Sequence, residues 1–147
     1  MRVDRKSNST TRFRANIVGL MPSTSTSIAV VDDDLPVRKA LVRLLSARGF
    51  TASIYQSGQE FIDSLEDAMP PQCLIVDVQM PEMTGLELQN HLVSAGVKIP
   101  TVVITAYDEP GIRDQCLAAG ATAFLVKPLD EERLISVVAS ALAYKPQ

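Results

Sequence analysis

CLIVDVQMPEMTG, residues 73–85, is the stretch that decides the fold. Its first four residues are apolar, Asp77 follows at once, and a turn rich in Pro, Met and Gly comes next. A short apolar run bounded by turn residues is typical of a strand buried on both faces. The sequence therefore predicts that Asp77 lies where this strand leaves the core, held by rigid backbone yet within reach of solvent.

Four other segments have the character of strands, and a helical pattern follows each of the five. The expected strands are Ile28–Val31, the edge strand Thr51–Tyr55, residues 73–76, Thr101–Ile104 and Ala123–Val126. The expected helices run from Pro36 to Gly49, from Gly58 to Asp67 behind a capping box of Ser57 and Glu60, from Gly85 to Gly96, from Pro110 to Gly120, and through Leu134 and Leu142.

Strict alternation of strands and helices predicts an α/β fold with crossover connections. Five strands favour a flavodoxin-like parallel sheet in the order 2-1-3-4-5, with βα repeated five times and helices on both faces. In the helix from Pro110 to Gly120, we expect Ile112, Cys116, Leu117 and Ala118 to face the core. Ligands of such sheets bind at the carboxyl ends of the strands.

The charge is unevenly distributed. Residues 1–27 hold five basic residues and one acid, whereas the rest of the 147-residue chain holds nine basic and sixteen acidic residues. We expect residues 1–27 to be a disordered basic Ser/Thr-rich tail and residues 28–147 to be one folded domain. A transit peptide, or a translation start at Met21, are the alternatives for this tail. The acidic domain argues against direct DNA binding.

The remaining composition narrows the class of protein. No apolar run approaches the ~20 residues that a membrane helix needs, so we expect no membrane contact and a cytoplasmic location. Cys73 and Cys116 lie in apolar stretches and are interpreted as small buried hydrophobic residues, with a disulfide as the minor alternative. His91 is expected at the surface. With no Cys or His beside the acids, we expect no zinc site.

Polar residues directly follow four of the apolar runs. They are Asp32 and Asp33, Asp77, Thr105, and Lys127. Because the carboxyl ends of parallel strands meet at one edge of a sheet, we expect these side chains to lie together. Three carboxylates a few ångströms apart repel one another, and a hard cation with oxygen ligands, Mg²⁺ above all, removes that repulsion. The set therefore predicts a phosphoryl-transfer site with Asp77 as nucleophile.

The sequence resembles the receiver domain of bacterial two-component response regulators, the CheY-like family, over about residues 28–143. The matching pieces are VVDDD at 30–34, LIVDVQMPEMTGLEL at 74–88, VVITA at 102–106 and AFLVKP at 123–128. Details such as TGLEL are similar to the receivers that carry a LuxR-type helix-turn-helix output, and no such output is expected in this chain.

The resemblance implies a role for each matched position. Asp77 would accept a phosphoryl group from a histidine kinase or a histidine phosphotransfer protein. Asp33, Asp32, Asp77 and the backbone carbonyl of Gln79 would bind Mg²⁺, with Asp32 acting largely through water. Thr105 and Lys127 would contact the phosphoryl group, and the Lys127–Pro128 bond would be cis. Phe124 would be the aromatic switch, and Gln79 and Tyr107 would border the path of the hydrolytic water.

Three functions follow from these residues. The leading one is a phosphorylation-dependent switch that catalyses only its own phosphotransfer and dephosphorylation. It would act through the face formed by the fourth helix, fifth strand and fifth helix, on a downstream protein or in a homodimer. Because Tyr107 is bulky, we expect an acyl-phosphate lifetime of minutes or longer. The alternatives are a receiver fragment of a DNA-binding regulator and a metal-dependent phosphohydrolase, disfavoured because Gln79 stands where a second acid is needed.

Overall fold

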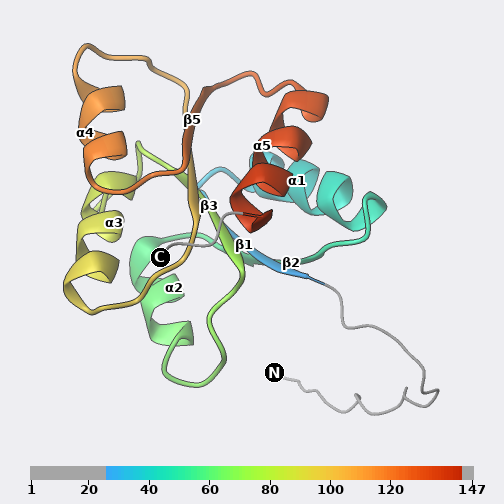
Figure 1. Cartoon of the computed structure of the whole chain (residues 1–147), viewed down its shortest axis with the longest axis horizontal. Coiled ribbons are helices and arrows are strands. Elements are labelled where there is room, and N and C mark those ends of the chain that lie inside the picture. The colour runs from blue at the N-terminus through green and yellow to red at the C-terminus, as the bar shows by residue number, and fades with distance from the viewer. Residues whose placement is uncertain (1–25, 144–147) are drawn as a thin grey trace.

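The computed structural model describes residues 26–143, so the predictions for residues 1–25 and 144–147 lie outside the described range. The chain alternates between strand and helix throughout (Figure 1). The elements are β1 (Ser27–Val31), α1 (Leu35–Ala47), β2 (Thr51–Tyr55), α2 (Gly58–Ser64), β3 (Cys73–Asp77), α3 (Gly85–Ser94), β4 (Thr101–Thr105), α4 (Ile112–Ala118), β5 (Ala123–Val126) and α5 (Glu131–Ala143).

The sheet has the predicted topology. Its five strands lie in the order β2-β1-β3-β4-β5, and every neighbouring pair is parallel. The register pairs Val31 with Val76 and Asp77 with Ile104, so the carboxyl ends of the central strands are level with one another. Among residues 26–143, no helix has both the length and the apolar character needed to cross a membrane.

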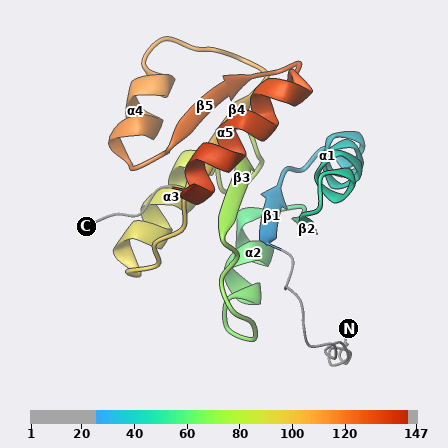
Figure 2. The ribbon, with the colours of Figure 1, turned by 45° about the vertical axis from the view of Figure 1, so that its right-hand side comes forward.

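Two apolar cores lie on opposite faces of the sheet. Alternate residues of each central strand point into different cores, as the pleat requires: Val30 and Ile75 pack with α1 and α5, while Val31 and Val76 pack on the side of α2, α3 and α4. Figure 1 and Figure 2 show the same division of the helices between the faces. Burial on both faces explains why these strands are continuously apolar in sequence.

Local signals fix the start of two helices. Thr84 and Glu87 form a complete capping box at α3, each side chain bonding the other's backbone N–H. At α2, Ser57 caps the backbone N–H of Glu60 as predicted, but the Glu60 carboxylate accepts from the N–H of Gln56. The prediction that α2 continues to Asp67 was wrong, because the chain leaves the helix for turns after Ser64.

Helix α4 is shorter than the helix from Pro110 to Gly120 that the sequence predicts. It begins at Ile112, after Gly111 has adopted a positive φ of 85°, so Pro110 lies outside the helix. The prediction that Leu117 and Ala118 face the core was wrong, since both side chains are exposed. A helix of seven residues buries only a narrow stripe, and Cys116 is its buried residue.

Gly85 is required by the close approach of two backbone segments. A Cβ atom at this position would overlap the carbonyl oxygen of Asp77. The same closeness lets the N–H of Gly85 donate to the carbonyl oxygen of Val78 over 3.0 Å. The turn after β3 is therefore held against the strand end that carries Asp77.

We expect Gly85→Ala to lower the free energy of unfolding by about 2 kcal/mol, because backbone must move to accept the new methyl group. Gly58→Ala is the matched control. Its Cβ would meet the sulfur of Met83 at 2.6 Å, and that flexible side chain can move. Urea denaturation of both variants gives the two losses; equal losses would contradict the explanation.

Candidate functional site

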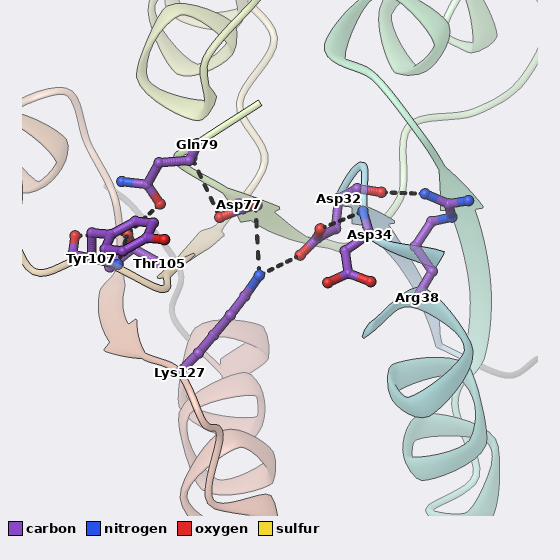
Figure 3. Close-up of polar contacts among 8 residues, drawn as sticks. All are labelled: Asp32, Asp34, Arg38, Asp77, Gln79, Thr105, Tyr107 and Lys127. Atoms are coloured by element: carbon purple, nitrogen blue, oxygen red, sulfur yellow. Dashed lines mark hydrogen bonds and ion pairs between the residues drawn. The ribbon is translucent and has the colours of Figure 1, made fainter. Parts of the chain in front are cut away.

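The polar residues predicted to converge do lie together at one edge of the sheet. Asp32 directly follows β1, Asp77 ends β3, Thr105 ends β4, and Lys127 directly follows β5. Figure 3 shows Lys127 reaching from β5 toward the carboxylates of Asp77 and Asp32. The parallel register brings them together, because it aligns the carboxyl ends of strands that are distant in sequence.

Three carboxylates form the acidic centre of the site. Asp32, Asp33 and Asp77 each offer an oxygen atom within 4.8 Å of the others. Asp32 and Asp77 are buried, while Asp33 is exposed. Oxygen donors of this kind suit a hard divalent cation, and so much negative charge in a partly enclosed site favours one. The residues therefore fit a Mg²⁺ ion, which needs few protein ligands and keeps several waters.

Lys127 provides positive charge between two of these acids. Its Nζ lies 3.0 Å from Oδ2 of Asp32 and 3.7 Å from Oδ2 of Asp77, so the shorter contact is the one to Asp32. Burial acts to lower the pKa of Lys127, but the hydrogen bond and charge of Asp32 outweigh it and raise the pKa overall. Lys127 therefore remains a cation.

Asp77 is held by longer contacts than Asp32. Its Oδ1 accepts a long hydrogen bond of 3.4 Å from the backbone N–H of Gln79, and its other partner is the distant Lys127. Burial, and next the charge of Asp32, raise its pKa to about 6. A buried carboxylate with weak partners is available to react or to bind a cation.

Asp32 is held from three sides. Its Oδ1 accepts from the N–H of Asp34 over 2.9 Å, and Oδ2 accepts from Lys127. The guanidinium of Arg38 donates to its backbone carbonyl oxygen. Asp34 occupies the N-cap position of α1, but its side chain makes no capping bond. Asp32 is thus fixed in place before any ligand binds.

Arg38 is a site residue that the sequence reasoning missed. It lies in α1 and is only 9% exposed, although arginine is rarely buried without a partner. A signal was present in the sequence, because Arg38 precedes Leu41 by three residues and so shares the buried face of the helix. Helical periodicity could have placed it on that face, but could not have identified the Asp32 carbonyl as its partner.

Thr105 is buried and bonded to neighbours other than Asp77. Its hydroxyl lies 2.6 Å from Oε1 of Gln79 and 2.9 Å from the carbonyl oxygen of Tyr107, and it accepts from the N–H of Tyr107 over 3.1 Å. Figure 3 shows the Gln79 side chain extending from the strand end of Asp77 to Thr105. The sequence placed all three residues in the site but did not predict this bond.

The other predicted positions lie around this centre. Phe124 is buried, and the Arg113 guanidinium carbon lies 4.9 Å from its ring centroid, a cation–π contact between α4 and β5. Tyr107 has its side chain largely exposed in the loop after β4. The Lys127–Pro128 bond is cis, as the resemblance implied. That Phe124 turns inward when Thr105 moves stays a prediction.

The residues expected to have no part in the site are remote from it. His91 is exposed on α3, as predicted. Cys73 and Cys116 are free and buried, which confirms their interpretation as hydrophobic residues. Burial raises the pKa of the Cys73 thiol to about 12, so it stays protonated and unreactive.

Comparison with known proteins agrees with this geometry. Residues 28–139 match the family model described as the response regulator receiver domain. The chain is 33% identical over 127 residues to the response regulator protein TodT of Pseudomonas putida, covering 86% of this chain and 56% of TodT. The chain therefore spans just over half the length of that relative.

Solved structures show the same likeness. The crystal structure of FixJ-N superposes with a TM-score of 0.76 at 30% identity, covering 85% of this chain and 99% of that structure. A response regulator receiver protein from Burkholderia phymatum gives a TM-score of 0.73 at 42% identity, covering 82% and 98% of the two chains. The predicted flavodoxin-like fold is confirmed.

The raised pKa of Asp77 predicts a pH-dependent cost to stability. Between the ordinary carboxyl pKa of 3.8 and about 6, the folded state holds a proton that the unfolded chain releases, so stability falls as pH rises. In metal-free buffer at pH 7.5, the free energy of unfolding of Asp77→Asn should therefore be about 1 to 3 kcal/mol higher than that of the unchanged protein. The gain should disappear below about pH 4.

Thermal or urea unfolding at several pH values measures this gain. Asp108→Asn is the control, because Asp108 is exposed and outside the acidic centre. A gain for Asp77→Asn that is constant from pH 4 to 7.5 would show that its cause is packing and not ionisation.

Proposed function

The chain belongs to the response regulator receiver domain family, and from this premise we propose that Asp77 accepts a phosphoryl group from a histidine kinase or histidine phosphotransfer protein. Receiver domains of this family are signalling domains. The observation that carries the proposal is the position of Asp77, a weakly bonded buried carboxylate beside two further acids and the Lys127 ammonium.

The transfer itself needs little from the protein beyond positioning. A carboxylate oxygen of Asp77 forms a bond to phosphorus, while the bond from phosphorus to the donor's imidazole nitrogen breaks and leaves its electron pair on that nitrogen. Lys127 remains protonated and moves its contact from Asp32 toward an oxygen of the transferred group. Thr105 donates its hydroxyl proton to another of those oxygens.

A divalent cation fits the same centre. Asp32, Asp33, Asp77 and the backbone carbonyl of Gln79 would hold Mg²⁺, and the ion would supply positive charge that stabilises the transferring phosphoryl group. Arg38 orients this set indirectly, because its bond to the Asp32 carbonyl fixes the backbone on which two of the acids lie. The ion would also offset the repulsion from Asp32 which, after burial, is the second cause of the raised pKa of Asp77.

We place the output of the switch on the face formed by α4, β5 and α5. Leu117 of α4 and Val126 of β5 are exposed apolar residues there, and a groove between these elements is lined by Arg113 and Phe124 among others. Thr105 ends the strand that pairs with β5, so its displacement reaches this face directly. A downstream protein, or a second copy of the chain, is the proposed partner.

Two further parts of the proposal concern lifetime and context. Tyr107 and Gln79 flank Thr105 and are proposed to slow hydrolysis to minutes or longer by obstructing water. The domain is proposed to act in the cytoplasm.

A second proposal is that this receiver controls transcription as part of a longer protein. It is favoured by the match to 57% of FixJ of Rhizobium meliloti, which is a transcriptional regulatory protein.

Substitution of the acceptor tests the proposed function. With radiolabelled acetyl phosphate and Mg²⁺, the unchanged protein should acquire a hydroxylamine-sensitive label, and Asp77→Asn should lose it at least about a hundredfold, since an amide is a poor nucleophile. His91→Ala should keep the label, because it removes an exposed imidazole remote from the site. Equal labelling of Asp77→Asn would place the acceptor elsewhere.

Metal binding should stabilise the fold. At a Mg²⁺ concentration tenfold above the dissociation constant, the melting temperature should rise by roughly 3 to 6 °C, because the ion binds only the folded acidic centre. Asp33→Ala should abolish this rise, whereas Asp34→Ala should retain it, since Asp34 does not belong to the acidic centre. Calorimetry with and without EDTA measures the shift, and a rise that persists in Asp33→Ala would remove Asp33 from the metal site.

A further inference from the structure

The side chain of Gln79 holds the hydroxyl of Thr105 in the resting site. The two atoms, Gln79 Oε1 and Thr105 Oγ1, lie 2.6 Å apart, a short hydrogen bond between the turn after β3 and the end of β4. Figure 3 shows this bond beside Asp77, with the Gln79 carboxamide directed toward Thr105 and away from Lys127. Thr105 is fully buried, so water does not compete for its hydroxyl.

A threonine hydroxyl has only one proton to donate. Here two acceptors lie within reach, Gln79 Oε1 at 2.6 Å and the carbonyl oxygen of Tyr107 at 2.9 Å, while the N–H of Tyr107 donates to the same hydroxyl. The single donor of the Thr105 hydroxyl is thus already engaged within the protein. A new acceptor on Asp77 can receive a hydrogen bond from this hydroxyl only if the bond to Gln79 or to Tyr107 is broken.

Gln79 is placed to make that exchange reversible. Its backbone N–H points to Oδ1 of Asp77 over 3.4 Å, so one residue touches both the proposed acceptor and the hydroxyl. Its side chain is half-buried, unlike that of Thr105. Once displaced, the carboxamide can bond to water, so its release does not strand a buried polar group.

We propose that Gln79 is a latch: its hydrogen bond keeps Thr105 in the resting position. A phosphoryl group on Asp77 would compete with the Gln79 carboxamide as acceptor of the hydrogen bond that the Thr105 hydroxyl donates. The inference rests on the proposed function of Asp77 and adds a regulatory role for one side chain. The strength of the Gln79–Thr105 bond sets how readily the phosphorylated form adopts the active arrangement. Gln79 is thus a positioning residue for Thr105, in addition to any effect on water.

The test uses beryllium fluoride as a phosphoryl mimic, at saturating Mg²⁺, on the full chain. Gln79→Met keeps the length of the side chain and the backbone carbonyl but removes the amide acceptor. We expect it to bind the mimic about fivefold more tightly than the unchanged protein, the factor that corresponds to one neutral hydrogen bond. Gln56→Met, at an exposed glutamine before α2, is the control and should leave the affinity unchanged.

A double-mutant cycle separates the latch from a general effect on packing. Thr105→Val removes the hydroxyl and keeps the shape, and in this background Gln79→Met should no longer change the affinity. Thr105→Ser keeps the hydroxyl and should restore the difference. The latch is overturned if Gln79→Met binds the mimic no more tightly than the unchanged protein, or if the fivefold gain persists in Thr105→Val.

Failure of the proposed function has a different signature. Mimic binding that is absent from the unchanged protein, or that survives in Asp77→Asn, would overturn both the acceptor role of Asp77 and the competition built on it. The resting bond is measured separately by thermal unfolding of the four cycle proteins in metal-free buffer. Additive effects of Gln79→Met and Thr105→Val there would overturn the latch whatever the mimic does.

Discussion

Mutual repulsion of buried carboxylates is the constraint on which this structure depends. Asp32 and Asp77 lie almost wholly out of water, their oxygens are close to those of Asp33, and one ammonium, that of Lys127, sits between two of them. Such an arrangement costs free energy that the fold must supply elsewhere. The two apolar cores on either side of a fully paired central strand provide that stability and prevent the acids from moving apart.

Much of the fold and of the site could be predicted because the carboxyl ends of parallel strands all lie at the same edge of the sheet. Each apolar run ends where a strand reaches the sheet edge, so the next polar residue falls into the site whatever its distance along the chain. Asp77, Thr105 and Lys127 were all placed by this rule. The continuous apolar character of the central strands, which comes from burial on both faces, made the rule easy to apply.

The rest depends on contacts that no local pattern specifies. The bond between Gln79 and Thr105 joins a side chain in the turn after β3 to one at the end of β4, and its existence depends on rotamers and on a separation of a few tenths of an ångström. The contact of Arg38 with a backbone carbonyl is of the same kind. The errors in α2 and α4 arose because tertiary packing, and not propensity, decides where a short helix stops.

The resting site already contains every side chain that the proposed chemistry needs, but those side chains are engaged with one another. Lys127 makes its shorter contact with Asp32, and Thr105 bonds Gln79, while Asp77 keeps only long contacts. In the proposed mechanism, activation is an exchange of partners within a formed site, in which a cation replaces Lys127 beside Asp32 and water replaces Thr105 on Gln79. Since each exchange substitutes one interaction for another, the free-energy difference between the two states is small, as a reversible switch requires.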